Sequence, residues 1–319
     1  MPRPRAEQIS VSDTPYYHVI SRCVRRTFLC GEDQKTGRSY EHRRGWIEER
    51  IRLLASVFSV DIASYAVMAN HYHLVVKLSP NDVDPWSDDD VLQRWRCLYK
   101  GAPLVQRYLD GQELCDAQLR QVARYAKAYR ERLADLSWFM KCLNEPIARQ
   151  ANREDQCTGH FWESRFKSYP LDTEEAVLTC MAYVDLNPIR AAIADTPETS
   201  DYTSIKERIE PQFNLAEAIQ SQTEQQSLNE FVLPLKPLLG FEGVIRNGDQ
   251  RGILFSFDDY LELVDSTGRI SRDDKRGAID ERALPILERL HLDPDRWCER
   301  ATAFEATYGD YRKERRRAA

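Results

Sequence analysis

The chain has 319 residues, which at about 100–200 residues per domain predicts two or three domains. Apolar residues make up 42% and charged residues 30%, a composition that excludes a disordered chain. The 45 Lys and Arg against 51 Asp and Glu give a net charge of −6, which excludes a histone-like basic coat but allows a local basic face. Eight cysteines without a C-x-x-C pair argue against a zinc ribbon. No apolar run approaches the roughly 18 residues of a membrane span, and the first residues lack an apolar signal region, so we expect a cytoplasmic protein without membrane contact.

The first 80 residues alternate between strand-like and helix-like patterns. Residues 16–23 have the composition of a strand, which runs into positive charge. In residues 41–58, apolar side chains recur at spacings of three and four, which predicts a helix that packs on a sheet. Two further strand-like runs, 62–68 and 74–78, are joined by a short polar link, so we expect a hairpin.

The middle of the chain is predominantly helical in pattern. An Asp-rich stretch opens a long helical insert that we place at residues 81–136. Residues 138–152 predict another helix, and the aromatic and basic segment 157–169 is expected to be extended. The clearest helix covers 172–187, because Asp172 and Glu175 form a start that resembles a capping box and Pro188 is expected to stop it.

The C-terminal third has a weaker pattern. Residues 206–232 predict a linker, since its stretch 220–226 contains no apolar side chain. Residues 233–319 predict a mainly helical accessory domain that ends in a basic tail at 312–317.

His71 and His73 flank Tyr72 at the start of a predicted strand. Side chains two residues apart on a strand point to the same face. Both imidazoles are therefore placed to bind one divalent ion, with Tyr72 on the opposite, apolar side. Taken alone, this spacing also fits two ordinary polar strand residues.

Tyr183 and Asn187 lie four residues apart and share one face of the predicted helix 172–187, beside its apolar stripe. Docking of that stripe on the sheet would bring a phenol and a carboxamide to the sheet edge, where the amide oxygen could complete a metal site with the two histidines. Taken alone, Tyr183 also fits a packing residue, and Asn before Pro also fits a helix stop.

Together these elements resemble a known family. The order is strand, helix, a hairpin carrying Asn-His-Tyr-His, a Gly-His-Phe-Trp segment, and a helix that ends Tyr-Val-Asp-Leu-Asn-Pro-Ile-Arg. It is similar to that of the single-tyrosine HUH transposases, and among them to the REP-associated tyrosine transposases of bacteria. The resemblance covers about residues 16–202, is interrupted by the insert, and leaves the C-terminal third unmatched. Ala69 departs from the family, which often has Pro there.

The resemblance implies an α+β fold with a ferredoxin-like HUH core at residues 1–80 and 137–205. It also implies that His71, His73 and Asn187 are ligands of Mg²⁺ or Mn²⁺ and that Tyr183 is the nucleophile. The implied activity is cutting and rejoining of single-stranded DNA through a 5′-phosphotyrosine. The implied substrate carries a REP-type hairpin, and a monomer is favoured over a dimer.

Single-stranded DNA requires cations for phosphates and flat side chains for bases. Candidates follow the first strand and interleave aromatic and basic residues in the segment 157–169. They are Arg22, Arg25, Arg26, Phe161, Trp162, Arg165 and Lys167. Core packing for the aromatic side chains and a solvated surface for the basic ones are the competing interpretations.

Two other functions remain open at this stage. A non-catalytic protein that holds REP hairpins would bind DNA without Tyr183. A metal-dependent phosphodiesterase whose histidines activate water would also keep its activity in Tyr183→Phe.

Overall fold

The computed structural model describes residues 9–24, 29–33, 37–210, 233, 236–242 and 251–270. Four antiparallel strands form one sheet in the order β2–β3–β1–β4. Their bounds are β1 (Tyr16–Arg22), β2 (Val60–Val67), β3 (His71–Leu78) and β4 (Lys167–Pro170). The expected mixed fold with an antiparallel sheet and packed helices is confirmed. The extended segment predicted at 157–169 is a regular strand only from Lys167 onward, although Trp162 forms an isolated bridge with Cys23.

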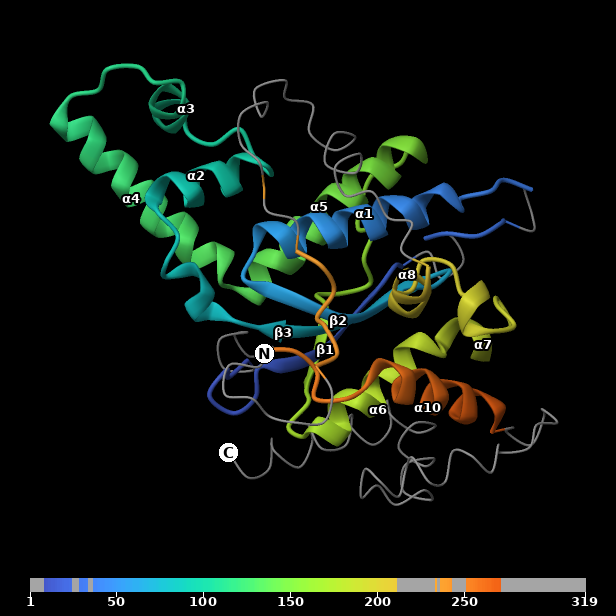
Figure 1. Cartoon of the computed structure of the whole chain (residues 1–319). Coiled ribbons are helices and arrows are strands. Elements are labelled where there is room, and N and C mark those ends of the chain that lie inside the picture. The colour runs from blue at the N-terminus through green and yellow to red at the C-terminus, as the bar shows by residue number, and fades with distance from the viewer. Residues whose placement is uncertain are drawn as a thin grey trace, which may run out of the picture.

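Helices cover both faces of the sheet (Figure 1). On one face lie α1 (His42–Val57) and α5 (Leu136–Glu154), and on the other lies α6 (Glu174–Asp185). The alternation of side chains along the strands decides this arrangement. On β3, Tyr72 joins the core on the α1 and α5 side, whereas Val75 joins the core beneath α6.

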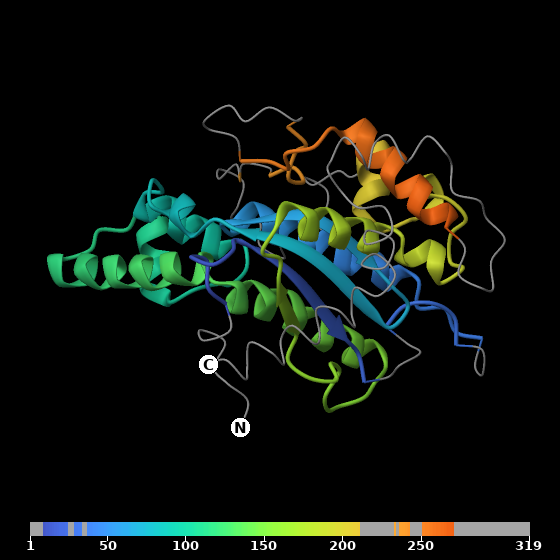
Figure 2. The same ribbon diagram turned by 90° about the horizontal axis from the view of Figure 1, so that it is seen from below.

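The insert packs against the same hydrophobic core as the sheet and helices α1 and α5. It contains a short 3₁₀ turn (Pro80–Val83), α2 (Asp88–Arg96), α3 (Pro103–Leu109) and α4 (Asp116–Leu133). Ser87 caps α2 by accepting the Asp90 N–H at 3.1 Å, and the Asp90 carboxylate accepts the Ser87 N–H at 3.0 Å. Apolar side chains of α2 and α4 belong to the same cluster as α1 and α5. The far part of α4 nevertheless projects beyond the sheet (Figure 2).

The helix predicted at 172–187 is two helices. Thr173 caps α6 by accepting the Ala176 N–H at 3.0 Å, and α6 ends at Asp185. A short helix, α7 (Asn187–Arg190), follows directly. Pro188 lies in the first turn of α7, where its missing N–H costs nothing, so it opens a helix instead of only stopping one.

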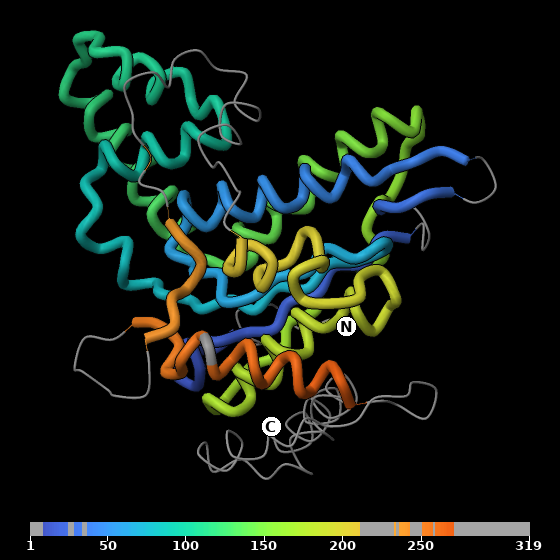
Figure 3. Tube along the Cα trace, turned by 45° about the vertical axis from the view of Figure 1, so that its right-hand side comes forward, coloured from blue at the N-terminus to red at the C-terminus, as the bar shows by residue number. Residues whose placement is uncertain are grey.

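Part of the predicted linker and C-terminal domain belongs to the core. A 3₁₀ turn (Pro197–Thr199) leads to α8 (Ser204–Ile209), so residues 206–209 are helical and the linker boundary at 206 is wrong. Helix α10 (Phe257–Arg269) lies beside α6 (Figures 1 and 3), and Tyr260 shares a buried cluster with it. The rest of the linker and the basic tail 312–317 lie outside the described residues, and a separate accessory domain stays a prediction.

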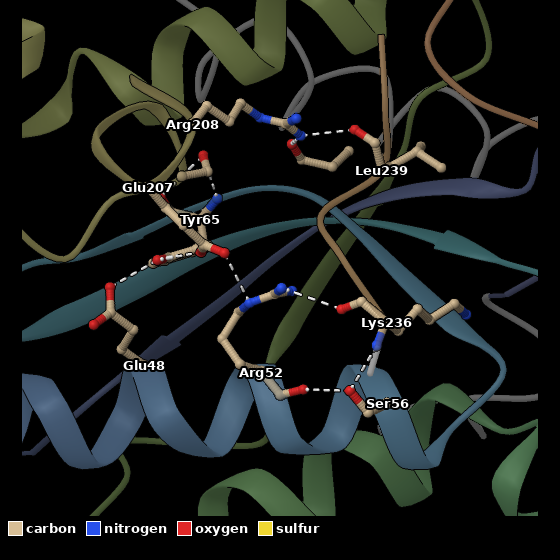
Figure 4. Close-up of polar contacts among 10 residues, drawn as sticks. Glu48, Arg52, Ser56, Tyr65, Glu207, Arg208, Lys236 and Leu239 are labelled. Atoms are coloured by element: carbon tan, nitrogen blue, oxygen red, sulfur yellow. Dashed lines mark hydrogen bonds and ion pairs between the residues drawn. The ribbon is translucent and has the colours of Figure 1, made fainter. Parts of the chain in front are cut away.

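The segment 236–239 is fastened across α1 and the edge strand β2 (Figure 4). The Leu239 N–H donates to the Ile62 carbonyl at 2.8 Å, and the Lys236 N–H donates to the Ser56 hydroxyl at 3.1 Å. Arg52 in turn donates to the Lys236 carbonyl at 3.1 Å. The open edge of β2 is therefore occupied by a later part of the chain. No helix among the described residues is long and apolar enough to cross a membrane.

Candidate functional site

Three histidines lie together on the α6 side of the sheet. His71 and His73 project from β3, and His18 projects from the neighbouring strand β1. The ring centroids of His71 and His73 are 4.7 Å apart, and those of His18 and His73 are 5.1 Å apart and stacked. Tyr72 faces the other way, as predicted, where its hydroxyl donates to the Asn144 side chain at 2.6 Å.

Hydrogen bonds orient both predicted ligand histidines. His73 Nδ1 lies 2.9 Å from His18 Nε2, and His71 Nδ1 lies 2.5 Å from the Asn70 side-chain oxygen. An amide oxygen only accepts, so the His71 proton sits on Nδ1 and leaves Nε2 as a lone pair. The Nε2 of His73 is buried and has no hydrogen-bond partner among the described residues. Engagement of the second ring nitrogen is typical of histidines that bind metals.

All three imidazoles are neutral at physiological pH. Burial lowers the pKa of His18 to about 3 and that of His71 to about 4. Burial, with smaller contributions from the neighbouring imidazoles, also holds the pKa of His73 well below its ordinary value. Neutral imidazole is the form that coordinates a metal ion.

Helix α6 brings Tyr183 to the histidines. The Tyr183 ring lies edge-on to the His73 ring, with centroids 5.6 Å apart. The centroid of the Tyr183 ring is 6.1 Å from that of the His18 ring. Asn187 follows as the first residue of α7, where its side-chain nitrogen donates to the Tyr183 carbonyl at 2.8 Å. That bond occupies the amide nitrogen and leaves the amide oxygen as the atom able to face a cation.

The chemistry of the predicted donors suits a hard or borderline divalent ion, and of these donors the structure shows His71 and His73 side by side. The described residues contain no group of three His, Cys, Asp or Glu side chains placed to hold a metal. The predicted set differs from such a group, since it consists of two imidazoles and one amide oxygen. The orphaned Nε2 of His73 is the observation that favours a ligand here, because a buried nitrogen without a partner is costly.

The predicted DNA-binding residues other than Trp162 divide into three groups. Arg22 is exposed at the end of β1, directly opposite His71 in the strand register, and Arg165 and Lys167 are exposed before and at the start of β4. Arg25 and Arg26 lie outside the described residues. Phe161 is only 2% exposed and belongs to the core, so its prediction as a base-stacking residue is wrong.

Trp162 has a mixed environment. Its indole N–H donates to the Asn144 carbonyl at 2.8 Å, and its ring meets Tyr72 edge-on. The side chain is half-buried and lies beside the end of β1, where Cys23 pairs with it. A structural role is therefore shown, and contact with DNA stays a prediction.

Sequence reasoning missed two residues of this site. His18 lies two residues from both Tyr16 and Ile20 on β1, so the three side chains share one face of the strand. This alternation could have indicated His18 from the sequence. Asp185 is fully buried on α6 between Tyr183 and Asn187, and its carboxylate accepts bonds from Ser204 at 2.7 Å and Tyr260 at 2.6 Å. No local sequence signal indicates those partners.

Comparisons with known proteins add little to this geometry. No family model matches the chain, and no curated protein sequence matches it. One solved structure, a REP-associated tyrosine transposase bound to a REP hairpin, is similar over 64% of this chain and 84% of that chain. The sequence identity is 9% and the TM-score is 0.32, a level of likeness that carries no argument about this chain.

Proposed function

We propose that this protein is a metal-dependent endonuclease and strand transferase for single-stranded DNA, acting through a 5′-phosphotyrosine on Tyr183. The observation that carries the proposal is the edge-on approach of the Tyr183 ring to His73, whose ring is held by His18 and lies beside that of His71 on the same face of the sheet. The strand order β2–β3–β1–β4, with α1 and α5 on one face, supports the ferredoxin-like core that the motif resemblance implies. The motif resemblance supplies the substrate class, a strand with a REP-type hairpin.

His71, His73 and the Asn187 amide oxygen would hold the metal, with Mn²⁺ or Mg²⁺ suited to such mixed ligands. When bound, the ion would supply positive charge next to a phosphate oxygen as negative charge grows there. The chain's own contribution is orientation. His18 fixes the ring of His73, Asn70 fixes the ring of His71, and burial keeps both imidazoles unprotonated.

Tyr183 supplies the nucleophile. Its phenolic oxygen bonds to the phosphorus while the bond from phosphorus to the 3′ oxygen breaks, and the phenol proton leaves as the 3′-hydroxyl gains one. An ordinary phenol has a pKa of about 10, so it is a weak nucleophile at neutral pH but a competent leaving group. A 3′-hydroxyl can therefore attack the phosphotyrosine and rejoin DNA without an external energy source.

The test compares wild type with Tyr183→Phe on labelled hairpin DNA with Mn²⁺, resolved on a denaturing gel that retains protein. Tyr169→Phe is the matched control, since this β4 tyrosine has its ring centroid 6.0 Å from that of His18. We expect a covalent adduct in wild type and Tyr169→Phe and none in Tyr183→Phe. Cleavage by all three proteins would assign the chemistry to activated water, and binding without cleavage by any would identify a non-catalytic hairpin-binding protein.

A further inference from the structure

A shallow, open hollow of about 580 Å³ lies at the corner where α4 meets α5, on the insert side of the molecule. Its walls include Arg132 at the end of α4 and Trp138 and Lys141 on α5. None of these residues contributes to the histidine and tyrosine site.

Two cations in this hollow are held on an aromatic ring. The Arg132 guanidinium carbon lies 4.4 Å and the Lys141 nitrogen 4.5 Å from the centroid of the Trp138 ring. Trp95 meets the Trp138 ring edge-on and stacks on Tyr129 with centroids 4.6 Å apart. Among the described residues, neither Arg132 nor Lys141 forms an ion pair, and contact with an aromatic ring does not cancel their charge.

Helix α4 extends the positive charge away from the hollow. Arg120, Arg124 and Lys127 are exposed and follow one another at spacings of four and three, so they lie on one face. The same face continues to Ala128 and Glu131, which line the hollow. No acidic residue occurs in α4 between Asp116 and Glu131. We call the surface of Arg120, Arg124, Lys127, Arg132, Trp138 and Lys141 the α4 track.

The carboxylates near the α4 track do not neutralise it. Asp135 is committed to α5, because its side chain caps the helix by accepting the Trp138 N–H at 2.8 Å. Glu131 is exposed at the rim. Asp116 lies four residues before Arg120, and Glu145 lies four residues after Lys141 but pairs with Arg149. The five cations of the α4 track therefore have four carboxylates near them, of which Asp135 and Glu145 have other partners, in a chain whose net charge is −6. A concentration of cations against the overall charge favours an anionic partner.

We propose that the α4 track binds single-stranded DNA, and specifically the unpaired strand that flanks the hairpin. The proposal rests on the proposed function for the identity of the substrate. A row of cations that ends at a tryptophan matches the phosphate neutralisation and the flat surface that an unpaired strand requires, and Arg132 or Lys141 has to move off the Trp138 ring for a base to stack there. Base pairing would hide the bases from Trp138, so the double-stranded stem fits this surface less well.

The experiment measures binding of the full-length protein to two fluorescent DNAs, a hairpin with a single-stranded extension and the same hairpin without it. The test variant is Arg124→Gln with Lys127→Gln, both exposed, so folding is preserved. The matched control is Lys100→Gln with Arg107→Gln, which removes the same charge from exposed positions of the same insert. Affinities are compared over a series of salt concentrations.

We expect the test variant to bind the extended DNA on the order of 10-fold more weakly, and the salt slope to fall by about 1.4, from about 0.7 per lost phosphate contact. Binding of the bare hairpin and binding by the control stay near wild type. An extension carrying 5-iododeoxyuridine should crosslink to the peptide that contains Trp138. Equal binding by test and control variants would overturn the proposal, as would polyglutamate competing as well as DNA.

Failure of this proposal and failure of the proposed function give different results. A wild-type adduct on Tyr183, together with unchanged binding in the test variant, would overturn the α4 track alone. Loss of extension binding in the test variant, without any adduct in wild type, would keep the track and overturn the nuclease. Wild-type protein that binds neither DNA would overturn the track.

Discussion

Tyr260 of α10 donates a 2.6 Å hydrogen bond to Asp185 of α6, two residues beyond Tyr183. Both side chains are buried, and Ser204 of α8 donates to the same carboxylate at 2.7 Å. Ser64 of β2 adds a third donor at 3.2 Å. Three elements from distant parts of the chain therefore fix the end of the helix that presents the proposed nucleophile.

Removing the Tyr260 hydroxyl should loosen this connection. We expect Tyr260→Phe to lower the free energy of unfolding by about 1–3 kcal/mol, because a buried carboxylate loses a donor. Urea denaturation measures the change. Tyr125→Phe, a half-buried tyrosine on α4, is the control and should stay within about 0.5 kcal/mol of wild type. Equal stabilities for the two variants would show that the Asp185 bond contributes nothing.

The surroundings of Glu48 predict that the free energy of unfolding depends on pH. The Tyr65 hydroxyl lies 2.7 Å from Glu48 and 2.9 Å from Glu207, and a single hydroxyl proton cannot serve both carboxylates (Figure 4). Arg52 pairs with Glu207 at 3.1 Å, so Glu48 is the one that carries a proton. Burial raises the pKa of Glu48 from 4.5 to about 7.

A raised pKa in the folded state means that the stability from this group is complete below pH 4.5 and is lost as the pH rises through 7. Unfolding measured from pH 4.5 to 8 should therefore show a decline that Glu48→Gln removes. Glu49→Gln, the neighbouring carboxyl, should keep the decline. A wild-type profile that rises over this range would contradict the assignment.

We expect replacement of His18 to weaken metal binding at His73 while the fold is kept. His18→Phe keeps a flat ring against His73 but removes the hydrogen bond to its Nδ1. Loss of such a supporting bond typically weakens metal binding about 10–100-fold. Titration calorimetry with Mn²⁺ measures this, with the exposed His160→Ala as control. Mn²⁺ affinity equal to wild type would argue against a metal on His73.

Phe161 and Arg165 should behave oppositely, although they lie four residues apart. Phe161→Ala should cost about 3–5 kcal/mol of stability, because the side chain is buried in the core. Arg165→Ala should leave stability within about 0.5 kcal/mol and weaken DNA binding, since its side chain is exposed. Unfolding curves and DNA titrations on both variants separate the two effects. A stable Phe161→Ala protein that binds DNA poorly would restore Phe161 to the DNA surface.

The local patterns of the sequence predicted the first three strands, the helix between them and the shared face of His71 and His73. The helix expected at 41–58 is observed at His42–Val57, and spacing of two places His71 and His73 on one face of β3. These features depend on periods of a few residues, which any window of sequence contains. Placement of Tyr183 next to His73 was expected from the motif and is observed.

Long-range packing was not predictable in the same way. The stacking of His18 on His73 depends on the register between β1 and β3, and the bond from Tyr260 to Asp185 spans 75 residues. Phe161 was misinterpreted because an aromatic residue among basic ones has the same local pattern in a core as on a DNA surface. Whether such a residue is buried or exposed depends on which distant segment packs beside it, and here the pairing of Cys23 with Trp162 brings the end of β1 to this segment.

The most direct test of the central claim is mass spectrometry of protein incubated with hairpin DNA and Mn²⁺, then digested with nuclease and protease. The account predicts a nucleotide attached through a phosphodiester to the peptide containing Tyr183 and to no other tyrosine peptide. A nucleotide on the Tyr169 peptide, or cleaved DNA with every tyrosine peptide unmodified, would contradict it.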